Sequence, residues 1–456
     1  MAKNTVATMG IIESLDHAGQ GIARADGKTI FVEGGLPGER VSWLSYRRKP
    51  NFEMARVTEI HKAASARVEP RCPHFGVCGG CSLQHADPVM QIATKQRVLE
   101  DNLQHIGNVK AGAVYAPISG PTWHYRFRAR VSVRLVPKKG GVLVGFHERR
   151  SSYIADMTSC EILPKQMSDM LVPLRHLVEG MSQPDRMPQI EMAVGDAPAG
   201  SGLPAGGLDI VLVLRHLEPL TEADQTRLAA FGRQYGVRWF LQPGGPATVH
   251  PLDPQDRPLL TYHLPNFGVS LDFAPTEFTQ VNPSINHALV TKAMRLLAAQ
   301  PGERVADMFC GLGNFTLPIA RSGATVVGVE GSEALVQRAA ENAAKNGLGG
   351  LTSFFAANLF LDCQPVLTRM GQLDRMLIDP PREGALELVK ALPDADQPRG
   401  GAPHTIVYVS CNPATLARDA GVLVNVKGYT LEGAGIANMF PHTAHVESIA
   451  VFRRAD

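Results

Sequence analysis

Cys411 is the residue whose surroundings in the sequence most strongly suggest chemistry. It lies in Val409-Ser-Cys411-Asn-Pro413, directly after residues 405–410, a run typical of a buried strand. Pro413 suits the first position of a helix that continues through Leu416. The thiol would then lie beside a helix N-terminus, where partial positive charge favours the thiolate. The segment predicts a reactive cysteine rather than a packed structural one.

A glycine-containing turn could bind a small cofactor. Asp307-Met-Phe-Cys-Gly311-Leu-Gly313-Asn314 ends a predicted strand and opens a helix, so backbone can approach a ligand over the helix N-terminus. Glu330 ends the next strand, nineteen residues beyond Gly311, where an acid can accept hydrogen bonds from ribose hydroxyls. Position 316 is Thr, so the G-x-G-x-x-G fingerprint of nicotinamide dinucleotides is incomplete. The pattern favours S-adenosylmethionine over a dinucleotide.

Asn358 and Asp379 end later predicted strands, at the carboxyl edge where such sheets bind ligands. Asp379-Pro-Pro-Arg382 would be a rigid turn at that edge. It is similar to the Asp-Pro-Pro-aromatic turn of amino-group methyltransferases, except that Arg382 replaces the stacking aromatic residue. Methylation of an amino group of guanine or adenine therefore stays open as an alternative, although that chemistry needs no thiol.

A thiol beside a methyl sulfonium site suits methylation at C5 of uracil. Addition of the thiolate to C6 makes C5 enolate-like, C5 attacks the methyl group, and a base then removes the C5 proton before elimination. Glu447, which opens a predicted strand, is a candidate base because a partly dry pocket raises the pKa of a carboxylate. His442 and His445 are further candidates, or they position the base or an RNA backbone.

Three cysteines, Cys72-x5-Cys78-x2-Cys81, share a glycine-rich segment, and Cys160 is the nearest candidate for a fourth ligand. Four thiolates suit zinc or a [4Fe-4S] cluster, and the unpaired spacing favours iron–sulfur. The spacing differs from the C-x3-C-x2-C of radical enzymes, which favours a structural or RNA-positioning role. A non-catalytic iron–sulfur RNA-binding protein is thus a third hypothesis. Cys310 and Cys363 are expected to be packed thiols.

The elements that must position these residues fall into two groups. Short strands separated by glycines over residues 10–60 predict a small β-barrel, with Arg47-Arg48-Lys49 in a connecting loop. From residue 271 strands alternate with helices, which predicts a doubly wound α/β domain with a mostly parallel sheet. Its expected strands are 304–309, 325–330, 351–356, 375–379, 405–410 and 447–452, and a helix is expected over 286–297. A further helical stretch is expected near residues 89–105.

Charge points to a polyanionic partner. The chain has 456 residues and a net charge of +2, but residues 1–150 carry 22 Lys and Arg against 12 Asp and Glu, whereas the rest carries 23 against 31. Within the basic part, Arg126, Arg128, Arg130 and Arg134 alternate with apolar residues and would share one strand face, a candidate RNA-contacting surface.

No apolar run approaches the roughly 18 residues of a membrane span. Met1–Gly10 lacks the layout of a secretory signal, and seven cysteines form no even disulfide pattern, so a cytoplasmic protein is expected. A large nucleic-acid substrate suggests a monomer.

These motifs together resemble the bacterial RNA uracil-C5 methyltransferases, in particular the members acting on 23S ribosomal RNA. The resemblance runs from about Gly10 to Phe452. It is carried by Arg71-Cys-Pro-His-Phe-Gly-Val-Cys-Gly-Gly-Cys81, Phe278-Thr-Gln-Val-Asn282, Phe309-Cys-Gly-Leu-Gly-Asn-Phe315, Val409-Ser-Cys-Asn-Pro-Ala-Thr415 and Met439-Phe-Pro-His-Thr-Ala-His-Val-Glu447. One departure is Pro381, where some members have Ala.

The resemblance implies an architecture: a TRAM domain, an OB-like RNA-binding barrel, over 1–62, a mostly β central domain carrying the metal cluster over 63–270, and a Rossmann-like S-adenosylmethionine-dependent methyltransferase domain over 271–456. It also implies roles: Cys411 as nucleophile and Glu447 as base, with a [4Fe-4S] cluster on Cys72, Cys78, Cys81 and Cys160. The implied cofactor contacts are Gln280, Phe309, Asn314, Glu330, Asn358 and Asp379. Because tRNA-specific relatives are expected to lack the TRAM domain and the cluster, the resemblance favours ribosomal RNA as substrate.

Overall fold

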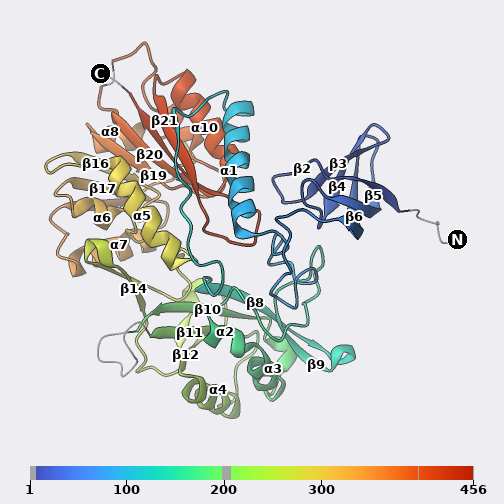
Figure 1. Ribbon diagram of the computed structural model, residues 1–456. Helices are drawn as coiled ribbons and strands as arrows, with labels where there is room; N and C mark the ends of the chain where they lie inside the picture. Colours follow the sequence, from blue (N-terminus) through green and yellow to red (C-terminus); the bar gives the residue numbers. More distant parts are fainter. Residues whose placement is uncertain (1–6, 198–206, 399, 455–456) are drawn as a thin grey trace.

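The computed structural model describes residues 7–197, 207–398 and 400–454, which form three large sheets and one two-stranded hairpin. In Figure 1 the N-terminal sheet (blue) lies beside the C-terminal lobe (orange and red), and the middle sheet (green) lies below. Within these ranges no helix is long and apolar enough to cross a membrane. Residues 1–6, part of the segment considered for a secretory signal, lie outside the described ranges.

The N-terminal sheet has six strands, and most of its residues lie in the region 10–60 where short strands were predicted. Its strand order is β1-β5-β6-β4-β3-β2, with bounds β1 Thr8–Ile11, β2 Ser14–Leu15, β3 Gly21–Ala25, β4 Lys28–Glu33, β5 Arg40–Arg48 and β6 Phe52–Lys62. Trp43 fills its core so closely that a Cβ on Gly10 would lie 2.6 Å from the indole ring. The predicted loop position of Arg47 and Arg48 is wrong, because β5 continues through both.

The middle sheet has the order β13-β12-β11-β10-β8-β9 and is flanked by three helices. Its strands are β8 Arg128–Val136, β9 Gly141–Gly145, β10 Gln189–Asp196, β11 Leu208–Arg215, β12 Val237–Gln242 and β13 His250–Pro251. The helices are α2 Lys165–Asp169, α3 Leu171–Glu179 and α4 Glu222–Tyr235, with short 3-10 turns at Pro137–Lys139, Pro184–Arg186 and Pro246–Thr248. A mostly β middle region is thus observed.

The C-terminal sheet has eight strands in the order β18-β17-β16-β19-β20-β22-β21-β7. The strands are β16 Arg304–Met308, β17 Thr325–Glu330, β18 Thr352–Ala356, β19 Arg375–Ile378, β20 Thr405–Ser410, β21 Thr430–Ala437 and β22 Glu447–Arg453, with β7 Ala113–Val114 at the edge. The first five strands of the order are parallel, and β22 runs antiparallel to β20 and β21. All six predicted strands are confirmed, and β21 was missed.

Helices cover both faces of this sheet. They are α5 Pro283–Leu297, α6 Thr316–Ala320, α7 Glu333–Lys345, α8 Gln364–Met370, α9 Leu386–Lys390 and α10 Pro413–Asn425. The predicted helix 89–105 is α1, Pro88–His105, and it packs against α10 and β21. The domain boundaries at 62 and 270 stay predictions, but α1 and β7 show that the middle of the chain also builds the C-terminal fold.

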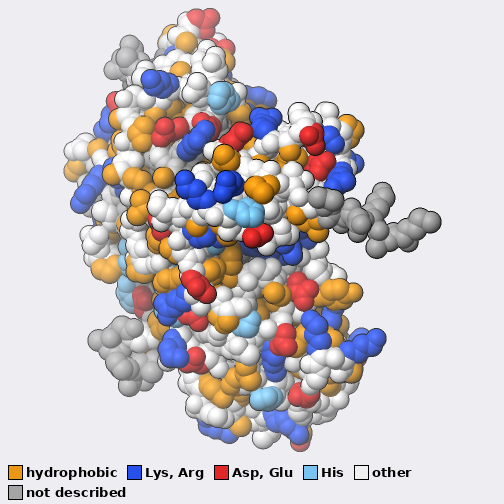
Figure 2. Space-filling model, turned by 45° about the vertical axis from the view of Figure 1, so that its right-hand side comes forward, with side chains coloured by type: hydrophobic (Ala, Val, Ile, Leu, Met, Phe, Trp, Pro, Cys, Tyr) orange, Lys and Arg blue, Asp and Glu red, His pale blue; other side chains and the backbone are white. Residues whose placement is uncertain are grey.

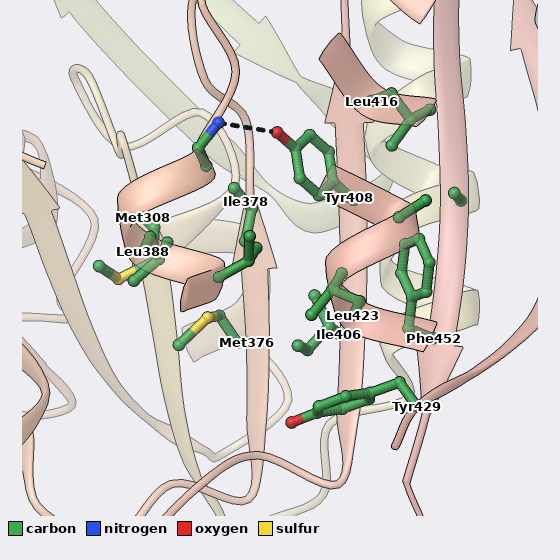
Figure 3. Close-up of a cluster of buried hydrophobic side chains, with 14 of the residues drawn as sticks. Met308, Met376, Ile378, Leu388, Ile406, Tyr408, Leu416, Leu423, Tyr429 and Phe452 are labelled. Carbon is green, nitrogen blue, oxygen red and sulfur yellow. Dashed lines mark hydrogen bonds between the residues drawn. The ribbon is translucent and has the colours of Figure 1, made fainter. Parts of the chain in front are cut away.

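Alternating side chains place one hydrophobic core on each face of the sheet. Met308, Ile378 and Tyr408 belong to one core, which also contains residues of α1, α9 and α10. Val305 and Val407 point to the opposite face of the sheet from Met308 and Tyr408. They belong to the other core, together with residues of α5 and α6. Figure 3 shows the first core, where the Tyr408 hydroxyl accepts a hydrogen bond from the Ala385 amide at 3.1 Å. Burial on both faces explains why these strands read as apolar runs.

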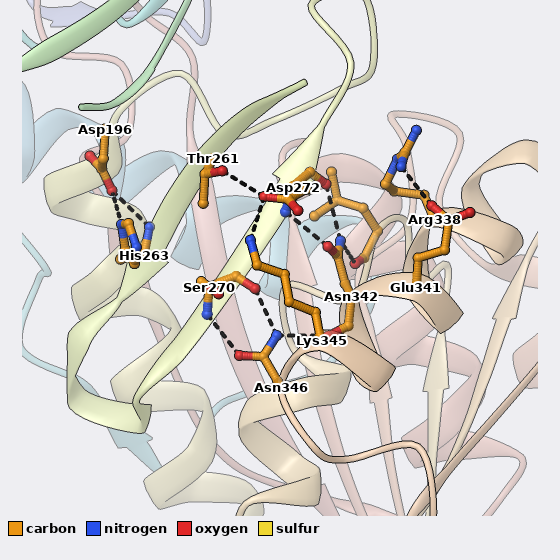
Figure 4. A network of polar contacts seen from close by, with 11 residues as sticks. Asp196, Thr261, His263, Ser270, Asp272, Arg338, Glu341, Asn342, Lys345 and Asn346 are labelled. Carbon is orange, nitrogen blue, oxygen red and sulfur yellow. Dashed lines mark hydrogen bonds and ion pairs between the residues drawn. The ribbon is translucent and has the colours of Figure 1, made fainter. Parts of the chain in front are cut away.

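A hairpin ties the middle region to the cofactor turn. Strands β14 Leu260–Leu264 and β15 Val269–Phe273, joined by the turn Pro265–Phe267, lie against α7. Asp272 accepts hydrogen bonds from Thr261 and from Lys345 Nζ at 2.5 and 2.6 Å (Figure 4). Asn342 donates to the carbonyls of Asp272 and Leu312, both at 3.1 Å, so this network fixes the glycine-containing turn against α7.

Candidate active site

Cys411 follows the last residue of β20, and α10 begins two residues later, as the sequence predicted. Asn412 is the N-cap of α10, since its side-chain oxygen accepts a hydrogen bond from the Ala414 amide at 3.1 Å. The Asn412 side-chain Nδ2 also donates to the Arg382 carbonyl at 3.0 Å. These contacts fix the turn that carries the thiol, and the Cys411 side chain stays partly accessible.

Glu447 is the first residue of β22, and the register of β20 and β22 brings it opposite Cys411. Ser410 pairs with Ser448, so in an antiparallel ladder the next positions are Cys411 and Glu447. Glu447 is 3% exposed. Burial, reinforced by the negative charge of Asp379, raises the pKa of Glu447 well above its usual range. A carboxylate in such a place is a stronger base than a solvated one.

The surroundings of Cys411 disfavour its thiolate, whereas the sequence had predicted a stabilised thiolate. Burial raises the pKa of the Cys411 thiol to about 11, and the charges of Glu447 and Asp379 contribute to that increase. Arg382 acts in the opposite direction. Desolvation and two nearby carboxyl groups outweigh the helix N-terminus, which the sequence alone had suggested would dominate.

Two further acids, Asp379 and Asp307, lie at the same edge. Burial raises the pKa of each to about 7. Asp307 is fully buried in β16, where one carboxyl oxygen accepts a 2.5 Å hydrogen bond from Thr316 and the other has no partner. A shared edge crowded with acids favours a ligand that brings positive charge.

The two histidines of the 438–446 loop differ in their surroundings. His442 is 2% exposed and stacks on Trp123, with 3.9 Å between ring centroids, and burial lowers its pKa to about 4. His445 lines the cavity at Cys411 and lies 3.2 Å from Arg382 through its Nδ1 atom. His442 is therefore packed inside the protein, whereas His445 is exposed at the cavity.

The glycine-containing turn and Glu330 lie in contact in the structure. The Glu330 carboxylate accepts hydrogen bonds from the backbone amides of Gly311, Gly331 and Ser332 at 3.1, 2.8 and 3.1 Å. Phe309, Gly311 and Gly313 all have positive φ angles, at 64°, 54° and 101°. Only glycine adopts such angles without strain, so the turn is held in an unusual shape and Phe309 pays a conformational cost there.

Asn314 is held by residues that the sequence reading had not connected to the site. Its side-chain amide exchanges two 3.0 Å hydrogen bonds with Asn286 on α5, and its oxygen also accepts from the Tyr262 hydroxyl at 2.9 Å. Asn286 is 3% exposed. Its position in a predicted apolar helix was a signal, because a buried amide there needs a polar partner.

Asn358 and Gln280 complete the predicted set of cofactor residues. Asn358 follows β18 at the same sheet edge, where its side chain accepts a 2.9 Å hydrogen bond from the Phe360 amide. Gln280 lies in the loop between β15 and α5 and is partly exposed. Together with Phe309, Asn314, Glu330 and Asp379, these residues come from the ends of four strands, β16 to β19, and from one loop around the carboxyl edge of the sheet.

The four predicted cluster ligands come together. Cys72, Cys78, Cys81 and Cys160 line one small cavity with apolar neighbours that include Met157 and Phe146. Burial raises the pKa of Cys81 to about 11 and of Cys160 to about 12. In the part of the chain that the structure describes, no group of three or more potential ligands is spaced to hold a metal ion. The chemistry of the donor set fits a thiolate-bound cluster, while its geometry does not by itself show one.

A cavity of about 710 Å³ opens at Cys411. Its walls come from the N-terminal barrel, the cysteine segment, α1 and loops of the C-terminal sheet. The lining residues include His17, Gly79, Ser82, Asn102, Arg382, Asn412, Thr443 and His445. A space of this size can enclose a flipped-out nucleotide, which chemistry on a stacked base requires.

The predicted surface of four free arginines is only partly correct. Glu191 on β10 pairs with Arg128 and Arg130, with N–O distances of 2.6 and 3.2 Å. The Arg128 side chain is 14% exposed, whereas that of Arg130 is 65% exposed. On the face shown in Figure 2, Lys and Arg side chains are mixed with acidic and apolar ones rather than gathered in one band.

Comparison with known proteins decides the family. The model for tRNA (Uracil-5-)-methyltransferases matches residues 268–455, and the TRAM domain model matches residues 11–42. The chain is 60% identical to the 23S rRNA (uracil(1939)-C(5))-methyltransferase RlmD of Aromatoleum aromaticum, over 98% of this chain and 99% of the relative. The chain belongs to this family of RNA uracil-C5 methyltransferases. A protein of the same name from an Azoarcus species is 60% identical over 97% of this chain and 99% of its own length.

The fold of this methyltransferase is shared with a solved archaeal enzyme. The tRNA (uracil-54, C5)-methyltransferase of Pyrococcus abyssi, in complex with S-adenosyl-L-homocysteine, superposes with a TM-score of 0.69 at 22% identity, over 98% of this chain and 100% of that one. So wide a match includes the N-terminal barrel. The expectation that this barrel separates ribosomal from transfer RNA enzymes is therefore wrong, because an enzyme named for tRNA shares the whole architecture.

Proposed function

We propose that this protein transfers a methyl group from S-adenosylmethionine to C5 of a uridine in 23S ribosomal RNA. Relatives named for that activity are 60% identical over nearly the full chain, which supports the choice of substrate. The observation that carries the proposed chemistry is that the β20–β22 ladder ends with Ser410 paired to Ser448, which brings the adjoining residues Cys411 and Glu447 close enough for the Glu447 charge to raise the pKa of the thiol. Amino-group methylation needs neither a thiol nor a base opposite it.

The first step requires the Cys411 thiol to release its proton to solvent and the resulting thiolate to bond to C6 of the uracil. Burial and two nearby carboxyl groups oppose thiolate formation, and Arg382 favours it. Arg382 is held beside His445 by a 3.2 Å contact, so it stays near the thiol. Addition moves the electron pair of the C5–C6 double bond towards O4, which leaves C5 able to attack the methyl group.

The second step requires a base for the C5 proton. Glu447 is buried opposite the nucleophile and has a raised pKa, which suits proton removal from carbon. As the proton leaves C5, the electron pair re-forms the C5–C6 double bond and the Cys411 sulfur departs as thiolate. Glu447 then carries the proton from C5, and passing that proton to solvent makes the base available for another cycle.

The methyl donor is proposed to bind along the same edge. Gln280, Phe309, Asn314, Glu330, Asn358 and Asp379 are the proposed contacts, and the donor supplies the electrophilic methyl group. Glu330 is suited to ribose hydroxyls because its carboxylate is already fixed by three backbone amides. Asp379 lies between this region and Cys411, where a carboxylate favours a cationic ligand.

The four thiols are proposed to hold a [4Fe-4S] cluster with a structural role. Cys72, Cys78, Cys81 and Cys160 share one cavity, and iron–sulfur clusters are held by four cysteine thiolates. Iron and acid-labile sulfide in anaerobically purified protein would test this, with Cys160→Ser expected to lower both and Cys363→Ser expected to leave them unchanged. Stoichiometric zinc without sulfide would contradict the proposal and favour the zinc alternative.

The proposed function is tested by measuring whether the hydrogen at C5 of uracil is released. Uracil carrying tritium at C5 should release tritium when RNA, S-adenosylmethionine and the protein are mixed, because C5 methylation replaces that hydrogen. Amino-group methylation would release none. Mapping 5-methyluridine in ribosomal and transfer RNA after deletion of the gene then assigns the substrate. Loss confined to transfer RNA would contradict the ribosomal assignment.

A further inference from the structure

The loop between β15 and α5, residues 274–282, is fastened to the middle sheet at two points. The Arg128 guanidinium donates a hydrogen bond through Nη1 to the Glu277 carbonyl, and the Phe127 amide donates to the Val281 carbonyl at 2.8 Å. These two contacts bracket Phe278-Thr279-Gln280. The shape of that tripeptide is therefore set by a strand about 150 residues earlier in the chain.

Arg128 is itself fixed. Its Nε and Nη2 atoms donate to one Glu191 oxygen at 3.1 and 2.6 Å. The side chain of Arg128 is 14% exposed and that of Glu191 is 5% exposed, so solvent screens this pair little. A guanidinium held by a buried carboxylate has few alternative rotamers, which makes its third contact, to Glu277, well defined.

The loop has further attachments in the C-terminal domain. Glu277 accepts a 2.7 Å hydrogen bond from the Ala274 amide and pairs with Arg338 on α7 at 3.4 Å. Asn282 caps α5 and donates to the Met439 carbonyl at 3.3 Å. Between these anchored ends Phe278 is 68% exposed. The segment Phe278–Gln280 is thus anchored at both ends, and Phe278 is exposed between the anchors.

We infer that Arg128 is a positioning residue for the methyl donor, because it holds the backbone of the Phe278–Gln280 segment in the shape that binds it. The inference rests on the proposed function, in which Gln280 contacts the donor. Without Arg128 the segment would have to be ordered at the moment of binding, and that ordering would weaken the affinity. Arg128 was predicted from sequence to contact RNA, and the structure turns it towards the cofactor loop instead.

The chain offers a closely matched control in Arg238. This residue also lies in the middle sheet, also pairs with a carboxylate, Asp209, at 2.8 and 3.1 Å, and also donates to a loop carbonyl, that of Arg257. Its side chain is 16% exposed. Arg128→Gln and Arg238→Gln therefore remove similar ion pairs from one sheet, but only the first pair reaches the 274–282 loop.

The experiment measures S-adenosylhomocysteine binding by calorimetry and hydrogen exchange across residues 274–282. Arg128→Gln is expected to raise the Kd by roughly tenfold, the effect of losing one charged hydrogen bond, and to speed exchange in the loop. Arg238→Gln should leave both within twofold of wild type, although both variants lower the Tm. If Arg128→Gln does not fold, Arg128→Lys, which keeps the charge but not the fork of donors, replaces it.

An unchanged Kd in the Arg128 variant would overturn the inference alone, as would an equal loss of affinity in both variants. Absence of S-adenosylhomocysteine binding to the wild-type protein would overturn the proposed function, and this inference with it. The two failures are therefore distinguishable in one set of titrations.

Discussion

The carboxyl edge of the C-terminal sheet has two halves with different side-chain environments: a cofactor half around Glu330 and Asn314, and a nucleophile half around Cys411 and Glu447. In the cofactor half, the side chains of Glu330 and Asn314 each have three hydrogen-bond contacts with the protein. In the nucleophile half, Asp379 and Glu447 raise the pKa of Cys411, and burial raises their own pKa values. The side chains of Glu330 and Asn314 are satisfied before any ligand arrives, whereas Asp379 and Glu447 are acidic groups that the fold does not neutralise.

This contrast indicates a division of labour. Fixed hydrogen bonds preorganise the cofactor half, so ligand binding there needs little rearrangement. In the nucleophile half the carboxyl groups are buried, which disfavours their negative charge. A cationic ligand, or the transfer of a proton to one of these groups, therefore changes its energy strongly. Substitutions in the nucleophile half are therefore expected to slow the chemical steps, and substitutions in the cofactor half to weaken the affinity for the methyl donor.

The largest expected effect is that of Cys411→Ser. A serine hydroxyl is a much weaker nucleophile than a thiolate, so methyl transfer should fall by about 10³-fold or more. The Kd for S-adenosylhomocysteine should stay within twofold of wild type, because the cofactor half is unchanged. Tritium release and calorimetry measure the two quantities, and a large change in the Kd would break the proposed division.

Glu447→Gln should slow turnover by roughly 10²- to 10⁴-fold, the range of general-base catalysis. Because addition and methyl transfer precede proton removal, the variant should accumulate a methylated RNA–protein adduct that wild type releases. Denaturing gel electrophoresis with labelled RNA measures the adduct. A slow variant without any adduct would instead place Glu447 before the addition step.

Glu330→Ala should weaken S-adenosylhomocysteine binding by roughly tenfold or more, since the acceptor for ribose is lost and three backbone amides lose their partner. The maximal rate at saturating S-adenosylmethionine should change far less than in Cys411→Ser. Glu341→Ala, on the exposed part of α7, serves as control. A fall of the maximal rate in Glu330→Ala as large as that in Cys411→Ser would contradict the separate roles of the two halves.

The smallest effect concerns stability. The pKa of Asp379 is raised to about 7, so its carboxyl destabilises the fold increasingly as pH rises from about 4 to 7 and fully above that. Below about pH 4 it is protonated in both states and costs nothing. Asp379→Asn should therefore match wild type at pH 4 and have a Tm a few degrees higher at pH 8. Thermal unfolding at both pH values checks the sign.

The sequence predicted those features of the fold that depend on neighbouring residues in the chain. The six strands of the C-terminal sheet were found because each is an apolar run bounded by turns, and Cys411 was placed because Pro413 begins a helix. The partner of α1 was not found, because an amphipathic stripe does not say which surface covers it. Contacts such as Gln91 with His442 join residues 351 positions apart.

Long-range contacts also explain why the predicted charge environments of Cys411 and Arg128 differ from those in the structure. The pKa of Cys411 depends on Asp379 and Glu447, which arrive from two other strands, so the neighbouring helix N-terminus alone gave the wrong direction. Arg128 was read as a free cation because Glu191, its partner, is 63 residues away and becomes its neighbour only through the pairing of β8 with β10.

The central claim is that the Cys411 sulfur bonds to the uracil ring, and a trapping experiment tests it most directly. RNA containing 5-fluorouridine, mixed with S-adenosylmethionine and protein, should form a stable adduct because fluorine at C5 cannot leave as a proton. Peptide mass spectrometry should locate the RNA on Cys411, and Cys411→Ser should form none. An adduct on another residue, or full methylation of ordinary RNA by the serine variant, would contradict the mechanism.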